Sequence, residues 1–219
     1  DNKRPAFLWN AQMDTARRIG YAERRQLCCT ERKILLMIPQ IIAHRGASYL
    51  APENTLAAFR KAMEIGADGV EMDVQKTLDG GLVIHHDYII DLHTDISGRI
   101  YDMTEGELKD LDFGSWKDVA YKDEKIATLA EALALCRSME GCTVQLEMKS
   151  TMDNDPAFVS GVVDAIRAAD IADRLVLISF NHDLLRQAKG LMTQLRVGVL
   201  LIESENVNVV QLGGSVHKK

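Results

Sequence analysis

The sequence lacks the features of three large classes of protein. No apolar run approaches the roughly 20 residues that a membrane-spanning helix needs. The first residues, DNKRPAFLWNAQMD, lack the uninterrupted apolar centre of a signal peptide. The net charge of −6 provides no basic field for nucleic acid or for an anionic membrane. We therefore expect no membrane span and no nucleic-acid partner.

Cysteine is scarce, and its spacing does not suit a metal site. Of the four cysteines, Cys28 and Cys29 are adjacent, whereas Cys136 and Cys142 lie in and just after an expected helix. We interpret them as reduced thiols of a cytoplasmic protein. What remains is an ordinary globular composition, 47% hydrophobic and 26% charged over 219 residues, which is long enough for one sizeable core.

From residue 41 onward, short apolar segments alternate with amphipathic ones. Strands are expected at 41–44, 69–75, 82–86, 143–149, 175–180 and 196–201. Helices are expected to begin at capping residues, namely Asn54 or Thr55, Thr104 with Glu107, Thr128 with Glu131, Asp155 before Pro156, and Asn181. Repeats of this kind, with parallel strands, predict an α/β fold, and charges on the inward face of the strands favour a barrel over an open sheet.

Two parts of the chain do not suit a complete barrel. Residues 1–37 mix basic and scattered apolar residues, so we expect an N-terminal extension of uncertain structure before a barrel domain at 38–219. A long connection, about 87–127, separates the third strand from the next helix and is expected to form a small insertion. An eight-stranded barrel typically needs about 250 residues. We therefore expect a TIM-type (β/α) barrel that is truncated after its sixth strand.

The stretch IIAHRGASYLAPENT, residues 41–55, is the first candidate for a site. An apolar strand ends there in His44 and Arg45, and Gly46 allows the backbone to turn before a helix begins. Parallel α/β proteins place their active sites at the carboxyl ends of strands in this way. The third strand ends in His85, His86 and Asp87, and side-chain alternation lets only one of the two histidines face inward. We interpret His44 and His86 as an acid–base pair.

Acidic residues recur on the inward face of two other strands. Glu71 and Asp73 share one face of the second strand, and Glu147 lies on the corresponding face of the fourth. Buried carboxylates so close together need a cation, and oxygen ligands without a thiolate suit Mg²⁺ or Ca²⁺. Arg45 and Lys149 supply positive charge of the kind that holds a phosphate. The alternative is that these carboxylates are solvated or salt-bridged on an exposed sheet face.

Taken in order, these motifs resemble the glycerophosphodiester phosphodiesterase family. Between about residues 39 and 201 the matching motifs are His44-Arg45-Gly46, Pro52-Glu53-Asn54-Thr55, Glu71-x-Asp73, His86-Asp87 and Glu147-x-Lys149, with further support from residues 111–116 and from Ser179-Phe180. The resemblance implies a TIM-type barrel with a small insertion after the third strand. It also implies hydrolysis of glycerophosphodiesters, as small-molecule substrates, to glycerol 3-phosphate and an alcohol.

The resemblance further implies a role for each matching position. Glu71, Asp73 and Glu147 would bind one divalent cation, His44 and His86 would be the catalytic acid–base pair, Arg45 and Lys149 would contact the phosphate, Glu53 would lie near the metal or the glycerol hydroxyls, and Phe113, Trp116 and Phe180 would wall the pocket. The sequence departs from the family in two places: Leu92-His93-Thr94 stands where the family usually has an Arg-Thr pair, and the pattern lacks the last two strands of the barrel. His93, His182 and His217 are interpreted as incidental.

Two alternatives to this function stay open at the level of sequence. One is a phosphodiesterase of the related lysophospholipase D kind, for which the sequence shows no apolar rim. The other is a truncated, inactive relative that retains only metal and phosphate binding. The sequence leaves open the headgroup, the choice between Mg²⁺ and Ca²⁺, and the oligomeric state, a homo-oligomer included.

Overall fold

The computed structural model describes residues 39–149, 155–201 and 217–218. All the helices and strands described here belong to the unit that begins at Ile41. The predicted N-terminal extension at residues 1–37, which includes Cys28 and Cys29, lies outside the described residues. Residues 202–216 and 219 also lie outside them. In the described part of the chain, no helix is both long enough and apolar enough to cross a bilayer.

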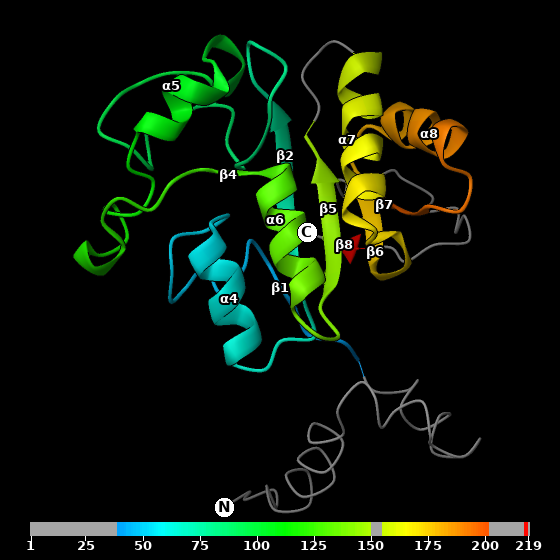
Figure 1. Cartoon of the computed structure of the whole chain (residues 1–219), viewed down its shortest axis with the longest axis horizontal. Helices are drawn as coiled ribbons and strands as arrows, with labels where there is room; N and C mark the ends of the chain where they lie inside the picture. Colours follow the sequence, from blue (N-terminus) through cyan, green and yellow to red (C-terminus); the bar gives the residue numbers. More distant parts are fainter. Residues whose placement is uncertain (1–38, 150–154, 202–216, 219) are drawn as a thin grey trace, which may run out of the picture. The chain divides into compact units, whose positions relative to one another are not determined.

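A mixed sheet organises this unit (Figure 1). In order along the sheet its strands are β4 (Ala127–Thr128), β3 (Leu82–Ile84), β2 (Gly69–Lys76), β5 (Thr143–Met148), β6 (Leu175–Ser179), β7 (Arg196–Leu201) and β8 (His217–Lys218), while β1 (Ile42–Ala43) pairs with the start of β2. The neighbouring pairs β2–β5, β5–β6, β6–β7 and β7–β8 run parallel. The α/β class expected from the sequence is confirmed, and β8 is a short strand that the sequence pattern did not predict.

The third strand is not part of the parallel set, and this part of the expectation was wrong. β3 runs antiparallel to β2 and ends at Ile84 instead of at residue 86, and β4 runs antiparallel to β3. The physical reason is the short turn around Gly80, which has a φ of +87°. A parallel connection needs a crossover of a dozen or more residues, whereas a tight turn returns the chain alongside the strand it has just left.

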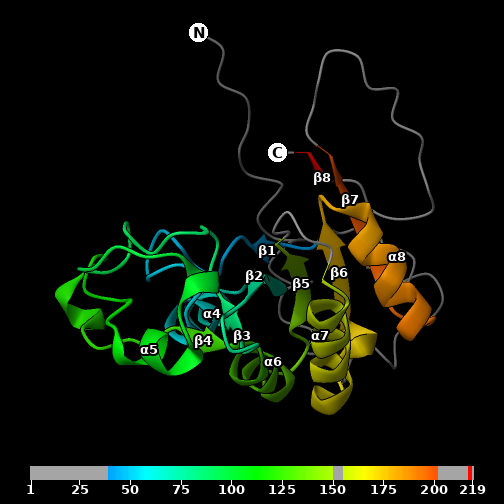
Figure 2. The ribbon, with the colours of Figure 1, turned by 90° about the horizontal axis from the view of Figure 1, so that it is seen from above.

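Helices cover one face of the strands, as the two ribbon views show (Figures 1 and 2). Their bounds are α4 (Leu56–Glu64), α5 (Glu105–Asp110), α6 (Leu129–Ser138), α7 (Pro156–Ala169) and α8 (His182–Leu191), with single 3₁₀ turns η1 (Ile100–Asp102), η2 (Val119–Tyr121) and η3 (Ala172–Arg174). The expected caps are confirmed: Thr55 caps α4, complete capping boxes open α5 and α6, and the Asp155 and Asn181 side chains cap α7 and α8.

The apolar residues of the central strands face these helices. Val70, Met72 and Val74 of β2 are fully buried and belong to one core with residues of α4, α6 and α7. The alternating polar residues therefore lie on the opposite face of β2. The parallel register pairs Asp73 with Glu147 on β5, so the acidic residues of the two strands are neighbours. The site therefore depends on this register.

The segment between β3 and β4 forms a small core of its own. Ile90, Ile100, Leu108 and Phe113 are buried there together with Val83 of β3 and Ile126. Residues 88–126, which we call the excursion, follow the turn at residues 85–87, include η1, α5 and η2, and extend to one side of the sheet in Figure 1. This separate core holds the excursion beside the end of β3.

Gly46 is held where the backbone of the first loop meets α4. Its φ is +78°, and a Cβ there would lie 2.7 Å from the Cβ and 2.9 Å from the carbonyl oxygen of Ala58. Gly66 also has a positive φ, +90°, but a Cβ there would meet nothing within 4 Å. An alanine at position 66 would therefore meet backbone strain alone, whereas an alanine at position 46 would meet both backbone strain and steric overlap.

We expect Gly46→Ala to destabilise the protein more than Gly66→Ala. The left-handed backbone alone costs an alanine about 1–2 kcal/mol, and overpacking at position 46 adds about 1–3 kcal/mol. The free energy of unfolding in urea measures both variants. Equal losses would contradict the close approach of the loop to α4.

Candidate metal and phosphate site

Three carboxylates meet on the polar face of β2 and β5. Oxygen atoms of Glu71, Asp73 and Glu147 all lie within 4.8 Å of one another. All three residues are buried, with exposed fractions of 6%, 0% and 2%. The sequence predicted this convergence, and the register that pairs Asp73 with Glu147 produces it.

Burial and mutual repulsion act strongly on this cluster. Burial, together with the neighbouring charge of Asp73, raises the pKa of Glu71 to about 8, although the Arg45 backbone N–H opposes the rise by donating to Oε2 over 2.9 Å. A carboxyl group whose charged form is so disfavoured is stabilised by a cation that replaces its proton.

Two basic side chains partly neutralise the carboxylates. Lys149 Nζ lies 3.1 Å from Glu147 Oε1 and 3.6 Å from Asp73 Oδ1. Arg45 Nε lies 3.8 Å from Asp73 Oδ2, but its Nη1 donates to Glu53 Oε1 over 2.8 Å. Because Arg45 is also paired with Glu53, the cluster of four acidic and two basic side chains keeps an excess of negative charge.

A divalent cation fits the donor set that remains. Asp73 Oδ1 is buried and has no hydrogen-bond partner among the described residues. An acceptor left in this way is costly unless another group coordinates it. Carboxylate oxygens are the ligands that Mg²⁺ and Ca²⁺ prefer. The residues present therefore suit the cation that the sequence predicted, at Glu71, Asp73 and Glu147.

The loop between β1 and α4 is folded around two strained residues. Arg45 and Asn54 have φ values of +57° and +58°, and the Asn54 N–H donates to the Arg45 carbonyl over 3.0 Å. The buried Asn54 amide donates to Asp73 Oδ2 over 2.9 Å and accepts from the Asp73 N–H over 3.3 Å. Left-handed non-glycine residues persist where the surrounding structure fixes them. Asn54 positions Asp73, a role that the sequence reading did not assign.

The two proposed catalytic histidines have different surroundings. His44 is half-exposed, and its Nε2 lies 3.8 Å from Glu71 Oε2. His86 is less exposed, and its Nδ1 lies 2.7 Å from Asp87 Oδ1. Burial alone would raise the pKa of Asp87, but the hydrogen bond and charge of His86 outweigh it, so that this pKa falls below its ordinary value. Asp87 is therefore an ionised partner that fixes the orientation of the His86 ring.

The aromatic residues expected to wall the pocket divide between two places. Phe113 is buried edge-on against His85, with ring centroids 5.7 Å apart, and Trp116 lies 4.6 Å from the ring of His93. Phe180 instead follows β6 and lines an open hollow of about 560 Å³ beside the start of α8, together with Asn181, His182, Asp183 and Arg186.

His85 and His93 form a buried pair that the sequence reading overlooked. Their nitrogens Nε2 and Nδ1 lie 3.0 Å apart, and the rings cross at 79°. The interpretation of His93 as incidental did not include this contact, because no sequence signal marks a contact between the turn after β3 and the excursion. Tyr88 is a further neighbour of the site, since the charges of Lys149 and Glu147 act on its pKa, which burial raises.

Comparisons with known proteins identify relatives of this arrangement. Residues 44–214 match the model of the glycerophosphoryl diester phosphodiesterase family. A glycerophosphodiester phosphodiesterase of Caldanaerobacter subterraneus is 41% identical over 160 residues, which are 73% of this chain and 65% of that protein. Human glycerophosphodiester phosphodiesterase 1 is 47% identical over 97 residues, which are 43% of this chain and 29% of that protein.

Solved structures agree with these matches. An Oleispira antarctica phosphodiesterase in complex with the product sn-glycerol-3-phosphate superposes with a TM-score of 0.71 at 38% identity, over 76% of this chain and 68% of that one. A glycerophosphodiester phosphodiesterase from Agrobacterium tumefaciens gives a TM-score of 0.66 at 29% identity, over 74% of this chain and 67% of that one. The chain spans 65% of the length of the first of its curated relatives.

We expect the stability of the protein to depend on pH through His85. Burial lowers the pKa of His85 from 6.5 to about 4, and the Asp87 carbonyl only partly offsets it. Between these values the unfolded chain binds the proton and the folded protein does not, so stability is full above pH 6.5 and falls as the pH approaches 4. The expected loss is on the order of 3 kcal/mol.

The free energy of unfolding, measured in urea at several pH values, gives this slope. His85→Asn is the matched control, because its amide nitrogen takes the place of Nδ1 and still donates to the Asp87 carbonyl, which lies 2.8 Å from Nδ1. In the variant, the free energy of unfolding should no longer show the decrease that protonation of His85 causes between pH 6.5 and pH 4. Equal slopes in the two proteins would show that His85 is not buried as a neutral ring.

Proposed function

The chain belongs to the glycerophosphoryl diester phosphodiesterase family, and from this premise we propose that it hydrolyses glycerophosphodiesters to sn-glycerol 3-phosphate and an alcohol. The observation that carries the proposal is the convergence of Glu71, Asp73 and Glu147 beside the basic side chains of Arg45 and Lys149, with His44 Nε2 lying 3.8 Å from Glu71 Oε2. Phosphodiester hydrolysis needs these elements: charge to neutralise the phosphate, and groups that move protons on either side of it.

We propose that Glu71, Asp73 and Glu147 hold one divalent cation, Mg²⁺ or Ca²⁺. When bound, such an ion neutralises phosphate charge and acts as a Lewis acid. Arg45 and Lys149 lie beside Asp73, so their positively charged side chains would contact the phosphate oxygens that do not bind the metal. Glu53 accepts the 2.8 Å hydrogen bond from the Arg45 guanidinium, and we propose that it lies near the metal or the glycerol hydroxyls of the substrate.

The proton transfers are assigned to His44 and His86. In the neutral His86 ring, Nδ1 carries the proton, because the Asp87 carboxylate only accepts hydrogen bonds. Nε2 then presents a lone pair, which a general base needs to deprotonate water or the glycerol 2-hydroxyl. His44 would accordingly protonate the departing alcohol. Phe113, Trp116 and Phe180 would limit the space around the substrate.

Several finer expectations remain proposals. They are the TIM-type barrel, whose pattern the sequence follows through the sixth predicted strand, the insertion after the third predicted strand at about residues 87–127, the domain limits, the cytoplasmic location and a homo-oligomeric state. The mixed α/β sheet and the similarity to solved phosphodiesterases support the barrel. An inactive relative that binds only metal and phosphate is the second candidate, since the acidic cluster and the neighbouring Lys149 account for binding without turnover.

Release of sn-glycerol 3-phosphate from glycerophosphocholine tests the function. We expect release in the presence of Mg²⁺ or Ca²⁺ and none after treatment with EDTA. Lysophosphatidylcholine, offered in parallel, tests the lysophospholipase D alternative. Binding of inorganic phosphate and metal without turnover would identify the inactive relative instead.

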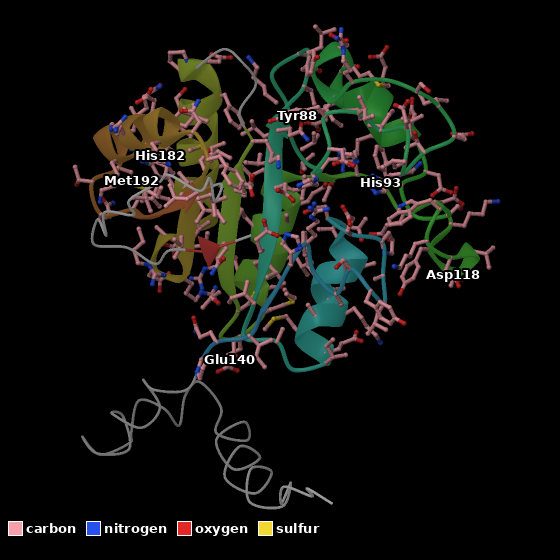
Figure 3. All side chains as sticks on the ribbon, turned by 180° about the vertical axis from the view of Figure 1, so that it is seen from behind. Tyr88, His93, Asp118, Glu140, His182 and Met192 are labelled. Atoms are coloured by element: carbon pink, nitrogen blue, oxygen red, sulfur yellow. The ribbon has the colours of Figure 1, made fainter. Side chains whose placement is uncertain are left out.

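Glu147→Gln tests the metal site. The amide keeps the shape of the side chain but removes a charged ligand, so we expect kcat to fall more than about 100-fold and the melting temperature to stop rising with added Mg²⁺ or Ca²⁺. Glu140→Gln is the matched control, because Glu140 is exposed and lies far from Tyr88, at the other end of the unit that begins at Ile41 (Figure 3). Unchanged kcat in Glu147→Gln would refute the assignment.

Asp87→Asn tests the role of His86. Removal of the carboxylate should reduce kcat by roughly 10²- to 10⁴-fold if the pair acts in proton transfer. It also disfavours the protonated ring, so the limb of the pH–rate profile that reports this histidine moves to lower pH. A shift of the acidic limb assigns His86 as the base. A shift of the alkaline limb assigns it as the acid, and a profile without any shift would remove it from both roles.

A further inference from the structure

The polar face of β2 continues beyond the carboxylates with Gln75. This side chain is buried, with an exposed fraction of 3%. Its amide nitrogen lies 2.8, 3.3 and 2.7 Å from the carbonyl oxygens of His85, His86 and Asp87. One NH₂ group has two hydrogens, so it is shared among three successive acceptors. A single side chain thus connects β2 to the whole turn that carries His86.

The His85 ring closes the same turn from its other side. Its Nδ1 lies 2.8 Å from the Asp87 carbonyl oxygen, which only accepts, so Nδ1 carries the proton. In the neutral ring Nε2 is then an acceptor, and the 3.0 Å contact requires His93 Nδ1 to be the donor. The hydrogen bonds therefore run in one direction, from His93 to His85 to Asp87, and fix the tautomer of both rings.

This chain of hydrogen bonds joins the excursion to the turn. His93 belongs to the excursion (Figure 3), where the Trp116 ring lies against it, with 4.6 Å between ring centroids. Phe113, also from the excursion, packs edge-on against His85. His85 and His93 have exposed fractions of only 4% and 8%, so water competes little for these bonds. The aromatic packing keeps the rings at the angle that the hydrogen bonds need.

We propose that Gln75, His85 and His93 are positioning residues, which fix the backbone of residues 85–87 so that His86 is held against Asp87 and directed at the substrate. The inference rests on the proposed function, because it presupposes that His86 moves a proton. Without the Gln75 amide or the His93 donor, buried acceptors lose their partners and the turn relaxes. A shift of about 1 Å in a catalytic group can reduce the rate about 10²-fold.

The decisive comparison is between His93→Asn and His93→Gln. The amide nitrogen of asparagine takes the place of Nδ1 and can donate to His85, whereas that of glutamine takes the place of Nε2 and cannot. With glycerophosphocholine as substrate, we expect His93→Gln to lower kcat about 10²-fold with KM within a few-fold. His93→Asn should recover most of that loss. Gln75→Met, which keeps the length of the side chain but has no donor, should behave like His93→Gln.

A spectroscopic signature accompanies the kinetics. The ¹⁵N signals of both His85 and His93 in the wild-type protein should show a protonated Nδ1 and an unprotonated Nε2. His93→Gln should let the His85 ring lose this single tautomer, and His93→Asn should preserve it. A change in overall packing alone would alter the melting temperature without this pattern.

The outcomes separate this inference from the function on which it rests. An active wild type with unchanged kcat in His93→Gln and Gln75→Met would overturn the positioning role alone. Equal losses of kcat in His93→Asn and His93→Gln would also overturn it. A wild type without turnover would overturn the proposed function and, with it, this role. If Gln75→Met does not fold, the His93 pair decides, because His93 lies outside β2.

Discussion

The structure depends on the burial of three carboxyl groups on one face of two parallel strands. Asp73 and Glu147 are register partners, and Glu71 lies two residues before Asp73 on the same face. A slip of one residue would turn every acidic side chain toward the helices. The cluster keeps an excess of negative charge and an unsatisfied oxygen of Asp73. Such an arrangement is costly by itself, so it indicates a site whose stability is completed by a cation.

This constraint also explains the shape of the surrounding loops. Arg45 approaches Asp73 from a left-handed backbone, and Gly46 lets the loop lie directly on α4. Asn54, equally strained, is tied to Asp73 by two hydrogen bonds. The strain is retained because these contacts fix the loop from both ends. Gln75 of β2 also holds the backbone of residues 85–87 by hydrogen bonds, so the strand that carries Glu71 and Asp73 is tied to the turn that carries His86.

The sequence predicted those features that follow from local periodicity. Alternation placed Glu71 and Asp73 on one face, and the capping residues Thr104, Thr128 and Asn181 located the helices. The direction of β3 was missed because an apolar strand reads the same in either orientation. Asn54, Gln75 and His93 were missed for another reason: their partners are 19, 10 and 8 residues away. No local pattern marks contacts of this kind.

The aromatic residues of the excursion have contacts that differ from the role that the family resemblance implies for them. The family resemblance assigns Phe113 and Trp116 to the wall of a pocket, yet Phe113 is 3% exposed and packs on His85. A side chain so buried can offer a substrate little surface, but it can hold an imidazole at a fixed angle. Trp116 is 40% exposed, and its indole N–H donates to the Phe113 carbonyl, so one part of the ring is anchored while another remains open to a ligand. The excursion therefore couples whatever contacts Trp116 to the turn that carries His86, through rings that do not themselves react.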